Sequence, residues 1–520
     1  MIVARRAFLK RGTAAAAGAA TIWRPRLASA LGAAVSQAQL AADPRRPQYH
    51  LLPPANWMND PNGPLYWKGQ YHMFYQYNPG AAVWGDMHWG HATSPDMVHW
   101  KHLPVALSPT PGGPDAAGCF SGTAVVEDGR VSMLYTGVRS VPESDATNRG
   151  DVHSFRESQC LAYSSDADLR SWTKVHDPVI AAPPADLAIT GFRDPSPWKE
   201  GSDWLLAVGS GVRRRGGAVL LYRSRDLRRW EYLHPLLIAD AAGEGTGNPV
   251  DSGEMWECPD FFPLGDRHVL IYSTQGKSLW KTGKFDRDRL TFHPEESGAI
   301  DTGCIYAAKS QVDRSGNRLV WGWVQETRPV EEYRAAGWAG VMSLPRRLSL
   351  GGDGRLRMEV APEVEQLRGE EQRLATAGGE EERAQQITRM KIEAACGEIS
   401  CSLRLGAEAF ALSLDDAGAT SGSSGAWLSI GFDPADSGKI RVDDHFIPLV
   451  PDSAAVELKI YVDSSVIEVI VNHSAAHTKR FYSAGSRARN LRLRWSGSTR
   501  MIERLSVWQL SAISANRLTT

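Results

Sequence analysis

Three acid-bearing phrases contain the residues of this chain best suited to chemistry. Asp60 lies in the phrase Asn-Trp-Met-Asn-Asp-Pro-Asn-Gly, Asp194 in Phe-Arg-Asp-Pro, and Glu257 in Trp-Glu-Cys-Pro-Asp. Carboxyl groups that share one site cannot all stay ionised cheaply, so the pKa of one of them rises. A protonated acid beside an ionised carboxylate can cleave a glycosidic bond. A single Asp-Pro-Asn-Gly is usually only a turn, so the hypothesis depends on convergence of the three acids.

A short phrase that recurs about every 64 residues indicates how the acids could meet. It consists of an aspartate, a few mixed residues and an aromatic residue, at Asp96–Trp100, Asp168–Trp172, Asp226–Trp230 and, in degenerate form, Asp288–Phe292. The intervals hold short runs rich in Val, Leu, Tyr and Trp, separated by turn residues, which is typical of strands. A unit of this length with about four strands has the size of a large β-propeller blade, and residues 45–350 have room for about five.

The acid phrases are in phase with this repeat. Asp194 follows Asp60 by about two repeats, and Glu257 follows Asp194 by about one. Ser121, in the phrase Cys-Phe-Ser-Gly, follows Asp60 by about one repeat. We therefore expect all four residues on the first, innermost strand of successive blades, where the carboxylates would face one cavity.

The composition changes near residue 350. Of the 18 Trp residues, 14 lie between positions 57 and 338 and only three beyond them. Residues 351–390 predict a linker, of which 362–390 are charged and partly helical in pattern, whereas residues 391–515 return to alternating strands such as Leu458–Asp463. The predicted fold is therefore all-β, with a five-bladed β-propeller at 45–350 followed by a C-terminal β-sandwich at 391–515.

The N-terminus has the pattern of an export signal. Arg5 and Arg6 precede a mild apolar run that is too short to span a bilayer, and Ala28-Ser29-Ala30 supplies the small residues that a signal peptidase reads. Residues 1–30 thus predict a twin-arginine signal and a periplasmic or extracellular location, with no membrane anchor after removal. That segment carries six basic residues and no acid, so its loss changes the net charge from -1 to -7.

Composition and missing motifs exclude several other classes. A balance of 58 basic and 59 acidic residues argues against nucleic-acid binding. The chain contains no G-x-S-x-G, H-E-x-x-H or phosphate-binding loop, so we expect no metal and no cofactor. Six Cys residues are too few for a disulfide scaffold in a chain this long, and Cys396 and Cys401 are the only two near enough in sequence to suggest a pair.

Taken together, the phrases resemble those of glycoside hydrolase family 32, the invertases, inulinases, levanases and related β-fructosidases. Besides the acid phrases, the matching stretches are Tyr75–Pro79, Trp84–Ala92, Gln159–Ser164 and Ser343–Arg347. The stretch 458–472 also looks like the family's C-terminal sandwich, so the resemblance covers about residues 45–510.

The resemblance implies a role for each acid. Asp60 would be the nucleophile that attacks the anomeric carbon of a terminal fructofuranosyl unit, and Glu257 the general acid and then the base. Asp194, with Arg193 beside it, would hold sugar hydroxyls and stabilise the oxocarbenium-like transition state. The family's retaining outcome predicts that the carboxyl groups of Asp60 and Glu257 lie about 5–5.5 Å apart.

The resemblance also implies a set of substrate contacts. The residues at the family's substrate-binding positions are Asn59, Gln76, Trp84, Phe120 and Ser121, and further candidates are Asp301 and Trp323. Amide and hydroxyl groups suit a polyol, and the two aromatic rings would form its apolar wall. Strand alternation should point Cys258, the residue after the acid, away from the substrate, so we expect it to serve packing.

Three functions fit this set of residues. The first is hydrolysis of terminal β-D-fructofuranosyl units of sucrose, inulin or levan through a covalent fructosyl-enzyme. A fructosyltransferase on the same scaffold uses the same acids, and the third alternative is a non-catalytic fructan-binding propeller, against which the complete acid set argues. Substrate size and endo or exo action depend on loops such as 141–158 and 240–254, which, like the oligomeric state, carry no readable pattern.

Overall fold

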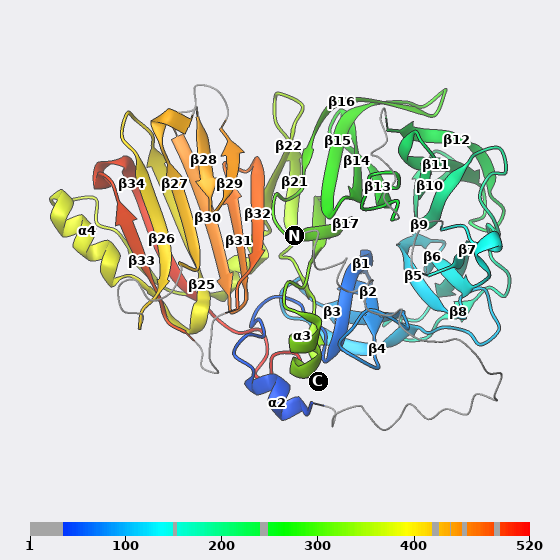
Figure 1. The fold of residues 1–520 in the computed structure, drawn as a ribbon, viewed down its shortest axis with the longest axis horizontal. Coiled ribbons are helices and arrows are strands. Elements are labelled where there is room, and N and C mark those ends of the chain that lie inside the picture. The colour runs from blue at the N-terminus through cyan, green and yellow to red at the C-terminus, as the bar shows by residue number, and fades with distance from the viewer. Residues whose placement is uncertain are drawn as a thin grey trace, which may run out of the picture.

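The computed structural model describes residues 35–148, 153–239, 248–418, 426–436, 438–449, 455–482 and 489–520. The predicted export signal, residues 1–30, lies outside this part of the chain. Strands make up nearly all of the regular structure, which confirms the all-β prediction (Figure 1). Within the described residues, no helix is both long and apolar enough to cross a membrane.

Residues 56–360 form five sheets, which occupy the right of Figure 1. Consecutive strands pair antiparallel in each sheet, as short apolar runs separated by tight turns favour. The strands of the first three sheets are β1 (Asn56–Trp67), β2 (Gln70–Asn78), β3 (His88–Ser94) and β4 (Lys101–Leu107); β5 (Gly118–Glu127), β6 (Arg130–Ser140), β7 (Phe155–Ser164) and β8 (Thr173–Lys174); and β9 (Ile189–Glu200), β10 (Asp203–Val212), β11 (Gly216–Ser224) and β12 (Glu231–Ile238). Those of the last two are β13 (Glu257–Leu264), β14 (Arg267–Thr274), β15 (Lys277–Asp286) and β16 (Thr291–Ala299); and β17 (Ile305–Val312), β18 (Arg318–Val324), β21 (Arg346–Leu350) and β22 (Leu356–Val360), with β19 (Trp338–Ala339) parallel to β1 and β20 (Val341–Met342) paired with β18.

The first strands of the five sheets contact one another. β1 contacts β5 and β17, β9 contacts β5 and β13, and β13 contacts β17. Asp60, Ser121, Asp194 and Glu257 lie on β1, β5, β9 and β13 respectively. The expectation that these residues occupy the first strands of successive sheets is therefore confirmed.

The recurring Asp-to-aromatic phrase is the turn between the third and fourth strands. The indole Nε1 of Trp100, Trp172 and Trp230 donates to the main-chain carbonyl three residues earlier, at 3.0, 2.8 and 3.0 Å. Each of those earlier residues has a left-handed backbone, with φ of 64° at Met97 and 57° at Leu227, for example. Asp96 and Asp226 accept from two main-chain N–H groups of their turns, whereas in the second phrase Asp166, and not Asp168, does so. The repeat is thus structural, because an aspartate and an indole satisfy the polar groups of each tight turn.

Two six-stranded sheets follow and share one apolar core, seen at the left of Figure 1. In sheet order they are β23 (Arg368–Arg373), β34 (Ile502–Leu510), β25 (Cys396–Arg404), β30 (Ala455–Asp463), β31 (Val466–Val471) and β32 (Ala475–Arg480), and then β24 (Lys391–Ile392), β33 (Leu491–Ser496), β26 (Phe410–Asp416), β27 (Leu428–Phe432), β28 (Lys439–Val442) and β29 (His445–Pro448). Cys396 and Cys401 both lie on β25 as buried free thiols, so they do not form a disulfide.

Helices are short and peripheral. They are α2 (Gln37–Ala42), α3 (Val330–Ala336) and α4 (Glu380–Arg389), with 3-10 turns η1 (Glu143–Asp145), η2 (Pro362–Leu367), η3 (Glu393–Ala395), η4 (Pro434–Asp436) and η5 (Thr499–Met501). The stretch 351–390, predicted as a linker, contains β22, η2, β23 and α4. Helix α3 contacts β19 and lies at the lower centre of Figure 1, above α2 and near the C-terminus of the chain.

A buried ionic network joins the two groups of sheets. Arg346 of β21 bonds Asp301 at 3.0 Å and Glu468 of β31 at 2.6 Å, and all three side chains are at most 1% exposed. The ring of His50 also joins this network: its Nδ1 contacts Asp463 at 2.8 Å, and its Nε2 contacts Glu468 at 3.0 Å. Buried ion pairs therefore hold the N-terminal segment, the fifth sheet and the C-terminal sheets together.

Candidate active site

The three predicted acids lie together. The thiol Sγ of Cys258 is 3.5 Å from Oδ2 of Asp60 and 3.5 Å from Oδ2 of Asp194. The main-chain N–H of Cys258 donates to the same Asp194 oxygen at 2.8 Å, and Glu257 is the preceding residue. The predicted convergence of carboxylates from β1, β9 and β13 is confirmed.

Irregular backbone on the first strands aims these side chains. The pairing register shifts between Met58 and Pro61 on β1, between Phe120 and Gly122 on β5, and between Glu257 and Asp260 on β13. Shifts opposite Asp194 on β9 and after Tyr306 on β17 repeat the pattern. A bulge re-aims side chains and breaks strict alternation, so each first strand can turn a polar side chain toward the same place.

Cys258 corrects one sequence prediction. Alternation along β13 was expected to point its thiol away from the substrate, but the thiol lies between two of the three acids. The cause is local, because Cys258 has a φ of 49° inside the bulge. Burial, followed by the charges of Asp194 and Asp60, raises the pKa of the thiol well above its usual value, so it is a neutral, unreactive group here.

Two donors fix the carboxylate of Asp60. Ser121 Oγ donates to Oδ2 at 2.7 Å, and Asn59 Nδ2 donates to Oδ1 at 3.0 Å. The indole of Trp57 in turn donates to Asn59 Oδ1 at 2.8 Å, which fixes the orientation of the amide. These donors fix the direction in which the carboxylate of Asp60 points.

Arg193 positions Glu257. Its Nε and Nη2 bond Oε1 of Glu257 at 3.1 and 2.8 Å, while Nη1 bonds Glu157 at 2.6 Å. The hydroxyl of Tyr306 donates to the other oxygen, Oε2, of Glu257. Although burial opposes the charge of Arg193, Glu157 and Glu257 raise its pKa well above the usual value, so the guanidinium stays charged.

Asp194 is the acid whose protonation the site changes most clearly. Its side chain is almost fully buried, and burial raises its pKa to about 7. Arg193 acts in the opposite direction, whereas the negative charges of Glu257 and Asp60 raise the pKa further. The expected rise of one carboxyl pKa is present, and Asp194 can hold a proton near neutral pH.

Aromatic side chains border the acids. Trp84 meets Phe120 edge to face at a centroid distance of 5.8 Å, and Trp323 meets Trp57 in the same way at 5.8 Å. The buried amide of Gln76 donates to the main-chain carbonyl of Cys119, beside Phe120. The structure therefore brings the predicted sugar-contact residues of the first, second and fifth sheets around the acid cluster.

Asp301 is the candidate that the structure places elsewhere. Its carboxylate is fully buried and bonds Arg346, Thr478 and the main-chain N–H of Gly303. These partners belong to the network that joins the C-terminal sheets to the fifth sheet. A partner as distant in sequence as Thr478 leaves no sign near Asp301. Nothing in the sequence therefore argued against the predicted sugar contact.

Two functional residues were not predicted. Glu157 is fully buried and holds Arg193, and the hydroxyl of Tyr306 bonds the Glu257 carboxylate. Glu157 stands two residues before the matching phrase Gln159–Ser164, whereas Tyr306 is near none of the matching phrases. The usable signal for Glu157 is its charge, because an acid inside a predicted strand needs a partner if it is buried.

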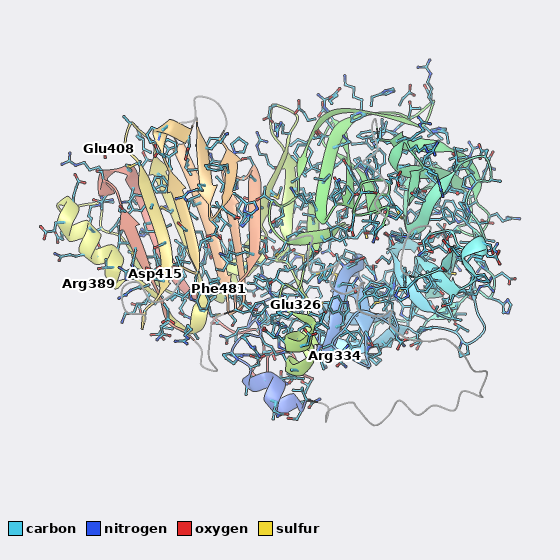
Figure 2. All side chains as sticks on the ribbon, in the orientation of Figure 1. Glu326, Arg334, Arg389, Glu408, Asp415 and Phe481 are labelled. Atoms are coloured by element: carbon cyan, nitrogen blue, oxygen red, sulfur yellow. The ribbon has the colours of Figure 1, made fainter. Side chains whose placement is uncertain are left out.

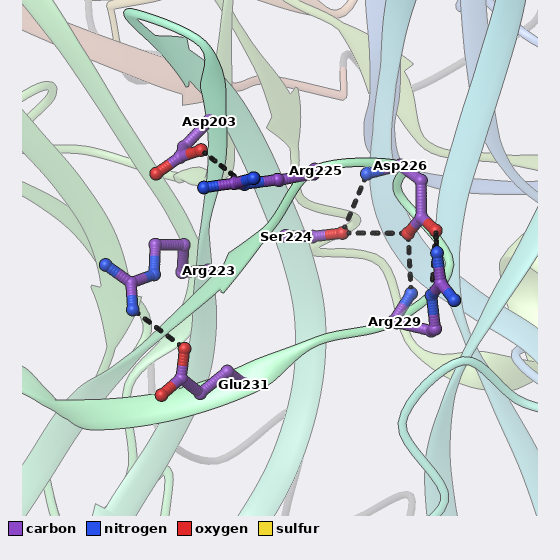
Figure 3. A pocket seen from close by; sticks show the side chains of 7 residues that line it. All are labelled: Asp203, Arg223, Ser224, Arg225, Asp226, Arg229 and Glu231. Atoms are coloured by element: carbon purple, nitrogen blue, oxygen red, sulfur yellow. Dashed lines mark hydrogen bonds and ion pairs between the residues drawn. The ribbon is translucent and has the colours of Figure 1, made fainter.

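A surface hollow on the third sheet is separate from the acids. Figure 3 shows that its side chains form ion pairs with one another, Arg223 with Glu231 at 2.8 Å and Arg229 with Asp226 at 2.7 Å. None of the predicted site residues belongs to its lining, which is Asp203, Arg223, Ser224, Arg225, Asp226, Arg229 and Glu231. These exposed pairs already satisfy one another, so the hollow does not compete with the acid cluster as a reaction site.

An all-β scaffold of repeated sheets with clustered carboxylates, one of them held by two hydrogen-bond donors, is characteristic of a glycosidase. Comparison with known proteins identifies the family within this class. Residues 50–360 match the glycosyl hydrolases family 32 N-terminal domain, and residues 363–509 match the family 32 C-terminal domain. The chain therefore belongs to glycosyl hydrolase family 32 and is a glycoside hydrolase.

Individual relatives agree with this assignment. The chain is 33% identical to a sucrose-6-phosphate hydrolase of Escherichia coli, over 89% of this chain and 94% of the relative. It is 39% identical to a raffinose invertase of Escherichia coli, over 62% of this chain and 66% of the relative. Among solved structures, a family GH32 β-fructofuranosidase of Bombyx mori matches with a TM-score of 0.73 at 28% identity, covering 91% of this chain and 96% of that one.

Proposed function

We propose that the protein is a retaining β-fructofuranosidase that hydrolyses terminal β-D-fructofuranosyl units of sucrose or of fructans. The observation that carries the proposal is the acid cluster, in which Asp60 is held by Ser121 and Asn59 while Glu257 is held by Arg193 and Tyr306. The two acids thus have different surroundings, as a nucleophile and an acid–base require.

In the first step, Asp60 attacks the anomeric carbon and Glu257 gives its proton to the leaving oxygen. The Glu257 carboxylate that forms is stabilised by the Arg193 guanidinium and the Tyr306 hydroxyl. In the second step, this carboxylate removes a proton from water, which cleaves the fructosyl ester on Asp60. A separation of about 5–5.5 Å between the two carboxyl groups is the expected geometry of this mechanism.

Asp194 binds the sugar in this proposal. Its pKa of about 7 leaves a fraction of the molecules protonated near neutral pH, so it can donate to or accept from a sugar hydroxyl. Trp84 and Phe120 would supply the apolar wall, with Gln76 and Trp323 further around the site. Asp301 takes no part, since its carboxylate bonds Arg346 and Thr478.

The architecture proposed for this enzyme is a closed five-bladed β-propeller at about 45–350, a connecting segment at 351–390 and a β-sandwich at 391–515. The contacts of β1 with both β5 and β17 support closure of the ring, and the shared core of the two C-terminal sheets supports the sandwich. We further propose that residues 1–30 direct export by the twin-arginine route, which would leave the enzyme in the periplasm or outside the cell.

The test is a product analysis with sucrose, inulin and levan. We expect free fructose as the main early product, and loss of at least about 1,000-fold of kcat in Asp60→Asn. Asp177→Asn, a change to an exposed carboxylate, is the matched control and should keep full activity. Oligofructans as the main product at high sucrose would favour the transferase, and an unchanged rate in Asp60→Asn would refute the assignment of the nucleophile.

A further inference from the structure

Three arginines from distant parts of the chain surround one buried indole. Arg46 follows α2, Arg328 precedes α3, and Arg480 ends β32. Their guanidinium carbons lie 5.3, 4.4 and 5.6 Å from the centre of the Trp338 ring. The N-terminal segment, the fifth sheet and the C-terminal sheets therefore place three positive charges around a side chain that is fully buried.

These guanidinium groups have N–H donors left over. Arg46 is 0% exposed and uses only Nη2, toward the carbonyls of Pro53 and Arg517. Its Nε and Nη1, Nη1 of Arg328, and Nε and Nη1 of Arg480 are buried without a partner among the described residues. Leaving a buried charged donor without an acceptor is costly, so these five atoms, on three guanidinium groups that all lie against the Trp338 ring, indicate a further acceptor.

The nearby carboxylates are already occupied. Glu326, which Figure 2 labels just above α3, accepts from Arg328 at 2.7 and 3.0 Å and from Tyr482 at 2.6 Å, and Nη2 of Arg480 lies 3.9 Å from its Oε2. Asp43 accepts from Arg45 at 2.9 Å and from the Trp338 indole at 3.0 Å.

Positive charge remains in excess at this junction. Two carboxylates stand against Arg45, Arg46, Arg328, Arg480 and Arg517. Burial, together with repulsion from Arg517 and Arg328, lowers the pKa of Arg46 to about 9. A further carboxylate, Asp463, attracts Arg517 but is already bonded by three main-chain N–H groups and His50.

We propose that Arg46, Arg328 and Arg480 bind a small inorganic anion, of the size of chloride, at the junction of the N-terminal segment with the two groups of sheets. A monoatomic anion suits the site because the donors belong to three separate segments and lie in buried side chains, which leaves little room for a larger ion. The anion accepts the spare N–H bonds and cancels part of the excess charge, so it stabilises the docking of the three segments.

The site is connected to the strand that carries Asp60. Trp338 begins β19, which pairs with Asn56 and Trp57 at the start of β1. Tyr333 of α3 also packs on Trp57, at a centroid distance of 5.8 Å. Loss of the anion should therefore first reduce thermal stability, and affect the reaction only through the position of β1.

Bromide replacement tests the site directly in the full-length enzyme. Crystals soaked in bromide should show an anomalous peak bonded by all three guanidinium groups. In solution, at constant ionic strength, each tenfold rise in chloride above half-saturation should raise the Tm by about 1–3 °C relative to gluconate, which is too large to enter.

Variants supply the control. Arg46→Gln and Arg480→Gln should lose the chloride dependence of the Tm, whereas Arg229→Gln, an exposed arginine of the surface hollow, should keep it. If Arg46→Gln does not fold, the bromide peak in the unaltered enzyme still decides. A water molecule in place of bromide, or the same Tm in chloride and gluconate, would overturn the proposal, and neither result depends on the proposed reaction.

Discussion

Replacing Asp194 by asparagine should stabilise the protein while it strongly slows the reaction. The pKa of Asp194 is raised from 3.8 to about 7, mainly by burial. Between these two pH values the folded protein holds a proton that the unfolded chain has released. The free energy of unfolding therefore decreases as the pH rises, and this part of the stability is lost once the pH passes about 7.

The size of the effect follows from the shift. Each pKa unit corresponds to about 1.4 kcal/mol, so the advantage of Asp194→Asn should grow from about 1 kcal/mol at pH 4.5 to about 4 kcal/mol at pH 7.5. The latter is an upper bound that corresponds to a rise in Tm of about 3–6 °C for the N-terminal sheets. The lost contact with the sugar should lower kcat/KM at least about 100-fold.

Thermal unfolding of both proteins from pH 4.5 to 8 is the assay. The exposed Asp177→Asn is the matched control, and its curve should follow that of the unaltered protein. A difference between Asp194→Asn and the unaltered protein that stays constant with pH, or a variant that is less stable at pH 7.5, would refute the reasoning about burial and charge.

Three further changes address single contacts. Ser121→Ala removes the 2.7 Å bond to Asp60 and should lower kcat/KM about 10–100-fold with an unchanged Tm, so steady-state kinetics that match the unaltered enzyme would contradict it. Glu157→Gln frees Arg193 on one side and should reduce kcat more than it changes KM, and an equal change in both would argue against positioning. Asp463 and Glu468 raise the pKa of His50 to about 9 against the effect of burial, so the free energy of unfolding should fall as the pH rises from 6.5 to 9. His50→Gln should remove this fall, and a pH dependence of the Tm that persists unchanged in the variant would contradict the reasoning.

The strands that hold the acids could be predicted because the sequence repeat determines which residues occupy equivalent positions. A four-stranded unit with one recurring turn phrase fixes which strand comes first, and residues one unit apart then occupy equivalent positions. Asp60, Ser121, Asp194 and Glu257 obey this spacing and lie on β1, β5, β9 and β13. The turn phrase itself is local, since Trp100 bonds a carbonyl three residues away, and local interactions are visible in a sequence.

What could not be predicted depends on bulges and on long-range pairs. Strict alternation misplaced Cys258 because a bulge with positive φ turns its thiol toward the acids. Asp301 was expected near the sugar, but Arg346 of β21 and Thr478 of the C-terminal sheets hold it. Glu157 escaped notice for a related reason, because its partner Arg193 lies on another sheet.

The covalent fructosyl-enzyme is the most direct test of the proposed mechanism. The variant Glu257→Gln, supplied with a fructoside whose leaving group departs without an acid, should accumulate an ester because the second step lacks its base. Mass spectrometry of the intact protein should show the addition of one fructosyl unit, and peptide mapping should place it on Asp60. Absence of the adduct, or its attachment to any residue other than Asp60, would contradict the account.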